Sequence, residues 1–332
     1  MPDSLAGIVA AFRDQRVLAI GDLMLDEFIW GKVSRISPEA PVPVVNVTGE
    51  SYYPGGAANV ARNLREFTAK TAVIGMVGAD PNGCRLLELL RGCDIDTRGV
   101  QQDAGMRTTV KTRIIARNQQ VVRVDREQRV ELSPEQAGRV AEQVERAARQ
   151  VDAIVVADYG KGFLNQALAD HICRVAAAER RILAVDPHPH TSLVWPGATV
   201  IKPNRTEAFL AAGLPAADAA ILPLEDRALL EAGERLRQRW DCGLVLITLG
   251  ENGMLLLEAG REPFHTPTRA KEVFDVSGAG DTAISVLALA LAAGATPRQA
   301  AELANSASGV AVGKLGTATV SQEELATAAG NR

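Results

Sequence analysis

Short runs of hydrophobic residues alternate along the chain with segments of helical periodicity. Six runs are apolar through most of their length, as strands covered on both faces are: 16–21, 71–78, 152–158, 181–186, 198–203 and 243–250. The segments between them place apolar residues at three- and four-residue spacing: 59–67, 83–92, 133–150, 167–180 and 225–240. Strands and helices that alternate in this way predict an α/β fold in which helices cover both faces of a mostly parallel sheet.

One region departs from this alternation. The segment 107–127, "RTTVKTRIIARNQQVVRVDRE", alternates β-branched and charged residues around "RNQQ", which predicts a hairpin with one apolar and one solvated face. Together with 41–53, "PVPVVNVTGESYY", it could form a small separate sheet that serves as a lid, a dimer surface or both. A hairpin at the edge of the main sheet fits the same pattern.

The candidate chemistry concentrates at the start of one apolar helix, "DVSGAGDTAISVLALALAAG", residues 275–294. Gly278 and Gly280 precede the helix, where glycine allows a sharp turn and where free N–H groups favour an anion. The letters also fit a dinucleotide fingerprint, but that motif belongs after the first strand of a domain. A P-loop requires Gly-Lys-Ser/Thr, which the chain lacks.

Asp281, in the first turn of this helix, has two interpretations. Beside a bound phosphate and a sugar hydroxyl, its carboxylate could act as a general base, a role worth about 10²–10⁴-fold in rate. The backbone amides of the glycine loop would then offset charge on the transferring phosphoryl group. The alternative is an acidic residue that only stabilises the helix dipole, by roughly 0.3–1 kcal/mol.

Composition narrows the class of protein. The 332 residues are 47% hydrophobic, and no apolar run reaches the length of a membrane span. The net charge is −4, so the chain lacks the excess of positive charge that nucleic-acid binding favours. The N-terminus lacks a signal-peptide pattern, and the four scattered cysteines suit reduced thiols in a cytoplasmic protein. A His-rich metal site is not expected from four histidines.

Three further stretches have polar residues where α/β sheets bind ligands. Asn204 and Glu207 share a helix face just after a strand, where they could order the waters of a phosphate-bound Mg²⁺ or form a plain capping box. Thr248 and Gly250 lie at a strand end, either in a ligand site or in a simple hairpin turn.

The third stretch suits a polyhydroxylated ligand. The glycine pair 55–56 precedes a helix that carries Asn59, and the acids Asp22 and Asp26 follow the first strand. These side chains offer both donors and acceptors to hydroxyl groups. Taken one by one, the acids are equally typical of turns.

Four stretches together resemble the signatures of the ribokinase (PfkB) family of carbohydrate kinases. These are "PGGAANVARN", "KPNRTE", "LITLGENG" and "DVSGAGDT", which occur in the family's order, with Val276 in place of the usual Thr. The likeness covers nearly the whole chain. It implies one ribokinase-like kinase domain over 1–332, a three-layer α/β sandwich with a mostly parallel central sheet and a small β-sheet lid at about 41–53 and 107–127.

The resemblance also implies roles for individual residues. Asp281 would take the proton of the accepting hydroxyl, and Gly278, Ala279 and Gly280 would supply the anion hole for the γ-phosphoryl group of ATP. Asn204 and Glu207 would place Mg²⁺ through water. The ATP site would be lined by Thr248, Gly250 and Asn305, and the sugar would be held by Asp26, Gly56 and Asn59.

Finer features resemble one branch of the family, the kinases that phosphorylate O1 of D-glycero-β-D-manno-heptose 7-phosphate on the route to ADP-heptose and lipopolysaccharide. They are "GDLMLDEFIWGKVSRISPEAPVPVV", "RNQQVVRVDRE", "ADYGKG" and "VGKLGTATVS". No H-x-G-H motif of a fused nucleotidyltransferase is present, so a stand-alone kinase is expected.

A sugar phosphate requires cationic donors at the far end of the pocket, for which Lys161, Arg113 and Arg123 are the candidates. His188 stands where relatives commonly have Lys. Some family members bind K⁺ beside the anion hole, which would involve Asp275 here.

Four functions are compared at this stage. The first is the heptose-phosphate kinase, expected to be a homodimer through its lid. The others are a family kinase for another sugar, a non-catalytic sugar-phosphate sensor and, most distantly, a dehydrogenase. The intact Asp281 argues against the sensor, which has no need of a base beside a phosphate loop.

Overall fold

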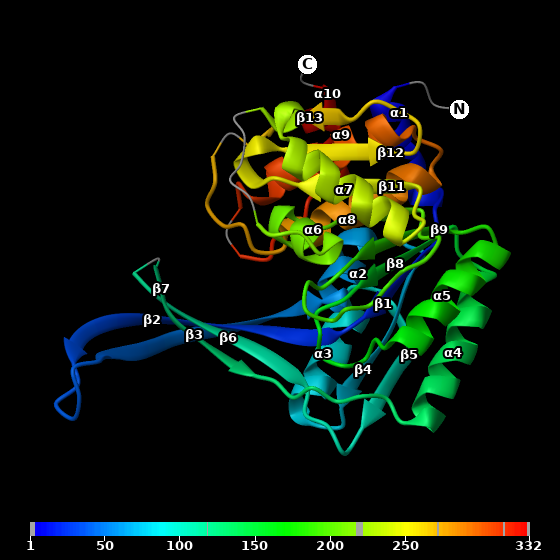
Figure 1. Cartoon of the computed structure of the whole chain (residues 1–332). Helices are drawn as coiled ribbons and strands as arrows, with labels where there is room; N and C mark the ends of the chain where they lie inside the picture. The colour runs from blue at the N-terminus through cyan, green and yellow to red at the C-terminus, as the bar shows by residue number, and fades with distance from the viewer. Residues whose placement is uncertain (1–3, 118, 217–221, 271, 315, 331–332) are drawn as a thin grey trace.

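The computed structural model describes residues 4–117, 119–216, 222–270, 272–314 and 316–330, which form a layered body and a projecting lid (Figure 1). The body contains a nine-stranded sheet of order β13-β12-β11-β10-β9-β8-β1-β4-β5. All neighbours from β11 to β5 are parallel, and the pairings β11–β12 and β12–β13 are antiparallel. This confirms the predicted fold class.

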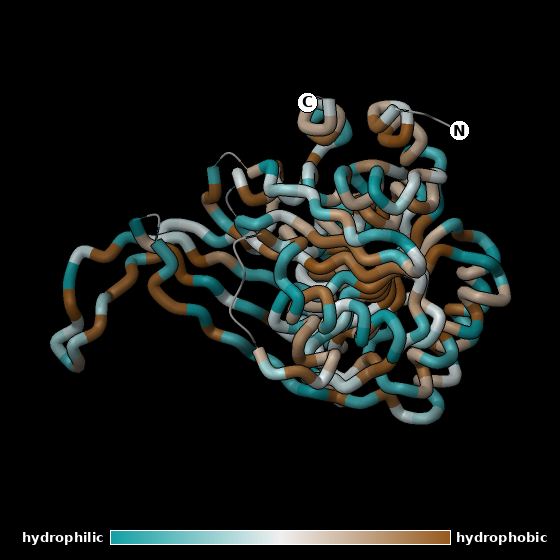
Figure 2. Tube along the Cα trace, turned by 45° about the horizontal axis from the view of Figure 1, so that its top comes forward, coloured by the Kyte–Doolittle hydropathy of each residue, from teal (hydrophilic) through white to brown (hydrophobic). Residues whose placement is uncertain are grey.

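The strands of this sheet have the following bounds: β1 Val17–Gly21, β4 Thr71–Gly78, β5 Asp96–Asp103, β8 Ala153–Ala157, β9 Ile182–Asp186, β10 Val200–Ile201, β11 Leu244–Thr248, β12 Met254–Glu258 and β13 Phe264–Thr266. The six apolar runs predicted as strands correspond to β1, β4, β8, β9, β10 and β11. Figure 2 shows these central strands as the most hydrophobic part of the trace.

Helices cover both faces of the sheet. One face is covered by α1 Leu5–Ala11, α2 Ala57–Arg65, α3 Pro81–Gly92, α8 Ala279–Ala292, α9 Pro297–Ala311 and α10 Gln322–Gly330. The other is covered by α4 Pro134–Ala148, α5 Gln166–Ala178, α6 Arg205–Ala212 and α7 Arg227–Arg239. Strand β1 contributes Val17 and Ala19 to one hydrophobic core and Leu18 and Ile20 to the other, because successive side chains alternate across the sheet.

Local sequence explains where several helices begin. Ser133 and Gln136 bond reciprocally at the start of α4 and form a capping box. Helix α8 begins after Gly278, whose left-handed conformation (φ 81°) is one that residues with a Cβ rarely adopt. The buried helix therefore starts at the glycine loop, as its sequence predicts.

The lid is a separate four-stranded sheet of order β3-β2-β6-β7, with bounds β2 Leu23–Ile36, β3 Pro43–Gly56, β6 Thr109–Ala116 and β7 Gln119–Arg126. The hairpin β6–β7 does not join the main sheet, so the edge-hairpin interpretation is wrong. Strand β2 was not predicted, and it makes the lid larger than the two expected segments. Asn118, in the predicted hairpin turn, lies outside the described residues.

Strand β2 continues from β1 with Asp22 as the only residue between them, so the first strand of the body leads directly into the lid (Figure 1). Asp22 is buried, and its carboxylate accepts the backbone N–H groups of Tyr159, Lys161 and Phe163 at 2.9, 3.1 and 3.2 Å. Asp22 therefore ties the base of the lid to the loop after β8, and does not itself face a ligand.

Candidate active site

The proposed base, Asp281, lies in the first turn of α8 and is only 5% exposed. Its Oδ2 accepts a hydrogen bond from Asn59 Nδ2 on α2 at 2.6 Å. Its Oδ1 accepts one from the hydroxyl of Tyr159, in the loop after β8, at 2.5 Å. The body and the loop beside the lid thus hold the two oxygens of one carboxylate.

The surroundings of Asp281 favour a base that titrates near neutrality. Burial raises its pKa from 3.8 to about 6, although the hydrogen bonds from Tyr159 and Asn59 act in the opposite direction. Asp186 and Lys202, which form a buried ion pair at 3.0 Å, act on the carboxylate with opposite signs. A buried carboxylate whose pKa lies nearer neutrality is a general-base candidate with a physical cause.

The predicted anion hole adjoins this carboxylate. A Cβ placed on Gly280 would come within 3.4 Å of Lys202 Nζ, so a buried ammonium group stands over the loop. The amides in the first turn of a helix have no intrahelical partner, but the Ala279 N–H donates to the Val276 carbonyl at 3.3 Å. Of the three predicted donors, Ala279 would have to give up that contact to bind a phosphoryl oxygen.

A cavity of about 590 Å³ opens beside the anion hole. Five residues predicted for the nucleotide side line it together: Thr248, Gly250, Ala279, Gly280 and Asn305. Asn305 is buried, and its amide nitrogen holds the loop after β13 through Thr266 Oγ1 and the Pro267 carbonyl. Gly250 begins the short turn Gly250–Asn252 between antiparallel β11 and β12, so the simple hairpin and the cavity wall are the same feature.

Asn204 and Glu207 form the capping box that was one of the two interpretations. Asn204 N–H donates to Glu207 Oε2 at 2.7 Å, and Glu207 N–H donates to Asn204 Oδ1 at 2.9 Å. Burial raises the pKa of Glu207, and nearby Asp186 adds to that shift.

These oxygens suit a hydrated Mg²⁺, which needs few protein ligands and would relieve the crowding of carboxylates. Asn204 also pairs with Thr248 in an isolated parallel bridge, so the helix start borders the cavity. Among the described residues, no three His, Cys, Asp or Glu side chains form a metal cluster.

The predicted sugar residues meet where the lid joins the body. Asp26 on β2 is buried and forms an ion pair with Arg113 on β6. The glycine pair is needed there, because a Cβ on Gly55 would lie 2.6 Å from Asp26 Oδ2 and one on Gly56 2.5 Å from the Asp22 carbonyl. Asn59 Oδ1 is buried without a hydrogen-bond partner in the described structure, which leaves an acceptor for a ligand hydroxyl.

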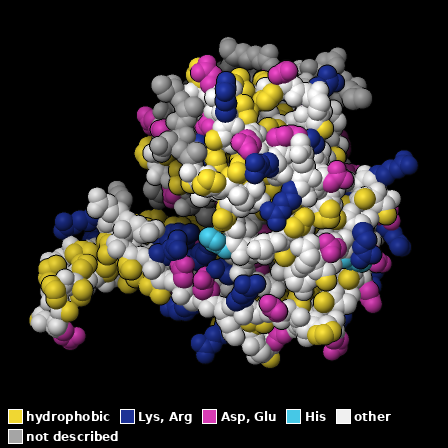
Figure 3. All heavy atoms as spheres, in the orientation of Figure 1, with side chains coloured by type: hydrophobic (Ala, Val, Ile, Leu, Met, Phe, Trp, Pro, Cys, Tyr) yellow, Lys and Arg dark blue, Asp and Glu magenta, His cyan; other side chains and the backbone are white. Residues whose placement is uncertain are grey.

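The three predicted phosphate-binding cations lie on the lid and the adjoining loop, and each has an acidic partner. Arg113 pairs with Asp26, Arg123 with Asp125 at 2.9 Å, and Lys161 with Glu127 at 2.6 Å. Arg113 and Arg123 are cross-strand neighbours and therefore share one face of the lid. Figure 3 shows Lys, Arg, Asp and Glu side chains gathered on the visible face near the junction of lid and body.

Lys111 completes this group, although the sequence reasoning missed it. It lies opposite Asp26 in the β2–β6 register, with its Nζ 5.6 Å from the centroid of the Tyr159 ring. Burial lowers its pKa, and Lys161 and Arg123 lower it further. His188 is affected by the same cations, because burial, His190, Lys161 and Lys111 all lower its pKa. This concentration of positive charge is a suitable environment for a phosphate.

Asp275 does not face the cavity as a free carboxylate. Its oxygens accept the N–H groups of Ser277 and Gly316 at 2.9 and 3.2 Å, and so connect the glycine loop with the segment after α9. These hydrogen bonds hold the two segments together. A cation bound beside Asp275 could still be coordinated by its carboxylate oxygens.

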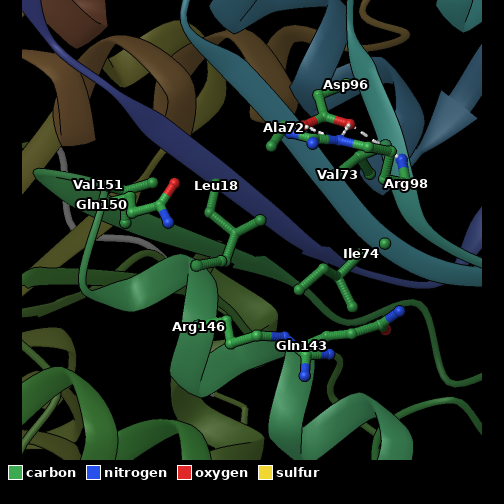
Figure 4. A pocket seen from close by; sticks show the side chains of 12 residues that line it. Leu18, Ala72, Val73, Ile74, Asp96, Arg98, Gln143, Arg146, Gln150 and Val151 are labelled. Atoms are coloured by element: carbon green, nitrogen blue, oxygen red, sulfur yellow. Dashed lines mark hydrogen bonds and ion pairs between the residues drawn. The ribbon is translucent and has the colours of Figure 1, made fainter.

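A second cavity, of about 330 Å³, lies between α4 and the sheet near β5 (Figure 4). Leu18 and Ala72, which line it, lie in the amino-terminal halves of β1 and β4, whereas ligand sites in such sheets lie at the carboxyl ends. Its Arg98 is paired with Asp96. This cavity is remote from Asp281, which lies at the carboxyl ends of the strands.

Tyr159 and Lys202, like Lys111, were not predicted as site residues. Tyr159 lies within "ADYGKG" and Lys202 is the first residue of "KPNRTE", so both belong to motifs at strand ends. That position was the available signal.

Known protein families, sequences and solved structures match most of the chain. The family described as pfkB family carbohydrate kinase matches residues 14–324. The chain is 44% identical over 317 residues to the "Bifunctional protein HldE" of Desulfatibacillum aliphaticivorans, covering 96% of this chain and 63% of that protein. It is 45% identical over 308 residues to the protein of the same name from Geobacter sulfurreducens, covering 93% and 61%. The chain thus spans about three fifths of the length of these relatives.

Solved structures share the fold. Ribokinase from Arabidopsis thaliana, complexed with ribose and ATP, is similar with a TM-score of 0.73 and 16% identity over 96% of this chain and 99% of that one. Phosphofructokinase-2 from Escherichia coli, in complex with potassium, gives 0.76 and 16% over 95% and 98%. Within the described residues, no helix is both long enough and apolar enough to cross a bilayer.

Proposed function

The chain belongs to the pfkB family of carbohydrate kinases, and from that premise we propose that it transfers the γ-phosphoryl group of ATP to O1 of D-glycero-β-D-manno-heptose 7-phosphate. The product would be the 1,7-bisphosphate, an intermediate on the route to ADP-heptose. The family assignment makes the chain a sugar phosphotransferase. The sugar, the position phosphorylated and the individual residue roles are the proposal.

The position of Asp281 carries this proposal. The carboxylate lies between the cavity lined by Gly280 and the lid face that bears Asp26 and Lys111. In the proposed reaction the O1–H proton moves to Asp281 as O1 attacks the γ-phosphorus, and the bond from that phosphorus to the β–γ bridging oxygen breaks. The amides of Gly278 and Gly280, with the Lys202 ammonium, would stabilise charge on the equatorial oxygens.

ATP would occupy the cavity of about 590 Å³, bordered by Thr248, Gly250 and Asn305. When bound, Mg²⁺ neutralises phosphate charge, and Asn204 and Glu207 would hold it through its waters. Asp275 would support a K⁺ ion beside the glycine loop.

Substrate preference would come from the lid. Asp26, with the free acceptor of Asn59, would receive sugar hydroxyl groups. Lys161, Arg113 and Arg123 would exchange their acidic partners for the 7-phosphate, and Lys111 would add a fourth cation. Burial is the main cause of the lowered pKa of Lys111, Lys161 and Arg123 lower it further, and a bound phosphate would offset that repulsion.

The proposal includes a homodimer formed through the lid. Val122 and Val124 on β7 are 45% and 41% exposed, and Val47 on β3 is 56% exposed, which leaves apolar surface for a second copy. Light scattering would test this assembly, and a wild-type monomer at micromolar concentration would contradict it.

An ADP-release assay across a panel of acceptors tests the substrate. The panel contains D-glycero-β-D-manno-heptose 7-phosphate, the unphosphorylated heptose, fructose 6-phosphate, ribose 5-phosphate and ribose. We expect kcat/KM to be highest for the heptose 7-phosphate. A higher kcat/KM for another sugar would identify the chain as a kinase of the same family for that sugar. Sugar binding with no ADP release in the presence of any acceptor would identify it as a sensor.

A further inference from the structure

Both oxygens of the proposed base are occupied by donors from the protein itself. Asn59 Nδ2 holds Oδ2 at 2.6 Å and the Tyr159 hydroxyl holds Oδ1 at 2.5 Å. A general base must lie within hydrogen-bond reach of the proton that it removes. A sugar hydroxyl therefore has to share an oxygen with one of these donors or displace it.

Tyr159 is the donor that resembles the substrate. Its O–H bonds to a carboxylate oxygen as an alcohol O–H would, whereas Asn59 presents an amide. Burial and the charge of Asp281 raise the pKa of Tyr159 well above 10, so the hydroxyl keeps its proton and remains a donor. The phenol thus reproduces the hydrogen bond that the accepting sugar hydroxyl would make.

The loop that carries Tyr159 adjoins the lid. Gly160 and Gly162 follow the tyrosine with φ values of 69° and 103°, a region in which glycine is unstrained. Lys111 of the lid lies 5.6 Å from the centroid of the ring. The Tyr159 side chain is only partly buried, unlike that of Asp281. A sugar that enters beneath the lid would therefore meet this ring before the carboxylate.

We propose that Tyr159 is a positioning residue whose hydroxyl occupies the place of the accepting sugar hydroxyl on Asp281 until the sugar displaces it. This inference rests on the proposed function, in which Asp281 is the base. Its consequence is control of a side reaction, because water is excluded from the base while ATP is bound without sugar.

The side reaction is hydrolysis of ATP. A water molecule on Asp281 Oδ1 would give one proton to the carboxylate while its oxygen bonds to the γ-phosphorus. The bond between that phosphorus and the β–γ bridging oxygen would break, releasing ADP and inorganic phosphate, and Asp281 would return the proton to solvent. Tyr159 prevents this by filling the water position.

Tyr159→Phe tests the proposal without any sugar. We expect hydrolysis of Mg–ATP to rise about tenfold or more, because water takes the vacated position beside a base whose catalysis is worth about 10²–10⁴-fold. Tyr52→Phe is the matched control, since Tyr52 also donates to a carboxylate, Glu50, at 2.7 Å but lies outside the site. Hydrolysis that is unchanged in Tyr159→Phe, with an unchanged melting temperature, would overturn the proposal.

The pH dependence distinguishes displacement from a merely structural contact. The charged groups that act on Asp281 are Asp186, at the end of β9, and Lys202, after β10; Tyr159 and Asn59 are its neutral partners. The Tyr159 hydrogen bond lowers the pKa of Asp281 in the free enzyme. Tyr159→Phe should therefore move the acid limb of kcat/KM for the sugar upward and leave that of kcat in place, since the sugar complex has already lost the bond. A shift in both limbs, or in neither, would overturn displacement.

Asp281→Asn separates failure of this inference from failure of the proposed function. If sugar phosphorylation survives in Asp281→Asn, Asp281 is not the base and the proposed function is at fault. If phosphorylation is lost, the double variant Tyr159→Phe with Asp281→Asn should also lose the gain in hydrolysis. A gain that persists in the double variant would show that it does not pass through Asp281, and would reject the role of Tyr159.

Discussion

The proposed nucleotide side of the site is made mainly of helix starts and strand ends of the body, whereas the proposed sugar side is made of charged side chains on the lid. On the nucleotide side, Gly280 and Gly250 line the cavity, and Gly278 begins the helix beside it. On the sugar side, Asp26, Arg113 and Lys111 face the site from adjacent strands of a thin sheet. We therefore expect substitutions that change the charge of the lid to alter the choice of sugar. Substitutions that change the glycine backbone should instead alter nucleotide binding.

Asp281 belongs to both sides, so its replacement should have the largest effect. Asp281→Asn keeps the shape of the side chain but removes the base, and kcat should fall at least a hundredfold. ATP binding, followed by calorimetry, should change little. Asp94→Asn, which alters an exposed carboxylate near Arg65, is the control and should retain wild-type kcat. A wild-type kcat in Asp281→Asn would remove the residue that joins the two sides.

Removal of a lid-side cation should have the next largest effect, confined to phosphorylated sugars. Lys161→Ala should raise KM for the sugar phosphate by roughly 10- to 100-fold, the range expected from a lost charge-assisted hydrogen bond of about 1.5–3 kcal/mol. KM for the dephosphorylated sugar should stay within about twofold. Arg139→Ala, which removes an exposed cation paired with Glu135 on α4, is the control. Equal changes in KM for both sugars would show that the phosphate binds elsewhere.

The pH dependence should show a moderate effect of the shared carboxylate. Because the pKa of Asp281 is about 6, kcat/KM should fall tenfold for each pH unit below that value as the base becomes protonated. The same shift affects stability with a definite sign. The folded form binds the proton more tightly than the unfolded form, whose pKa is near 3.8, so the contribution of Asp281 to the free energy of unfolding falls as pH rises from about 4 to 6.

Chemical denaturation at pH 4, 5, 6 and 8, with Asp281→Asn as the reference, would measure that contribution. A difference between the two proteins that stays constant across these pH values would contradict the raised pKa.

Two glycine substitutions should have the smallest effects, and these effects on the free energy of unfolding should have opposite signs. Gly278→Ala should lower the free energy of unfolding by about 1 kcal/mol, because the residue has a left-handed φ of 81°. Its Cβ would also come 3.1 Å from Asn59 Nδ2, so KM for ATP should rise. Gly138→Ala, inside α4 and with open space around it, should raise the free energy by about 0.5–1 kcal/mol. Thermal and denaturant unfolding would measure both, and equal signs would contradict the backbone argument.

The body could be predicted from the sequence more completely than the lid. Strands buried on both faces are short and apolar, so β1, β4 and β8 stand out in the pattern of residues. Strand β2 does not, because one face bears the polar groups of the site and the other is partly solvated, which breaks the alternation in "LMLDEFIWGKVSRI". Its pairing with β6 joins residues more than eighty positions apart, and only the folded chain reveals that register.

The site shows the same division. Asp281 and Asn59 are in recognisable signatures, and the structure brings them together. Tyr159 and Lys202 lie in motifs and Lys111 lies in the predicted hairpin, but the sequence did not single them out as site residues. Their importance depends on which strand ends and lid positions become neighbours in the fold. Asn204 and Glu207 form the predicted capping box, and their proposed role in placing Mg²⁺ stays a prediction.

The single residue between β1 and β2 has a mechanical consequence. Rotation of the four-stranded sheet against the body would change the backbone dihedrals of Asp22, as well as those where β3 runs into α2, and the Asp22 carboxylate binds the segment that carries Tyr159. Opening and closing of the lid would therefore be coupled to the arrangement around the Asp281 carboxylate through Asp22. Amide exchange at residues 159–163 should slow in step with exchange along β2 when an acceptor binds.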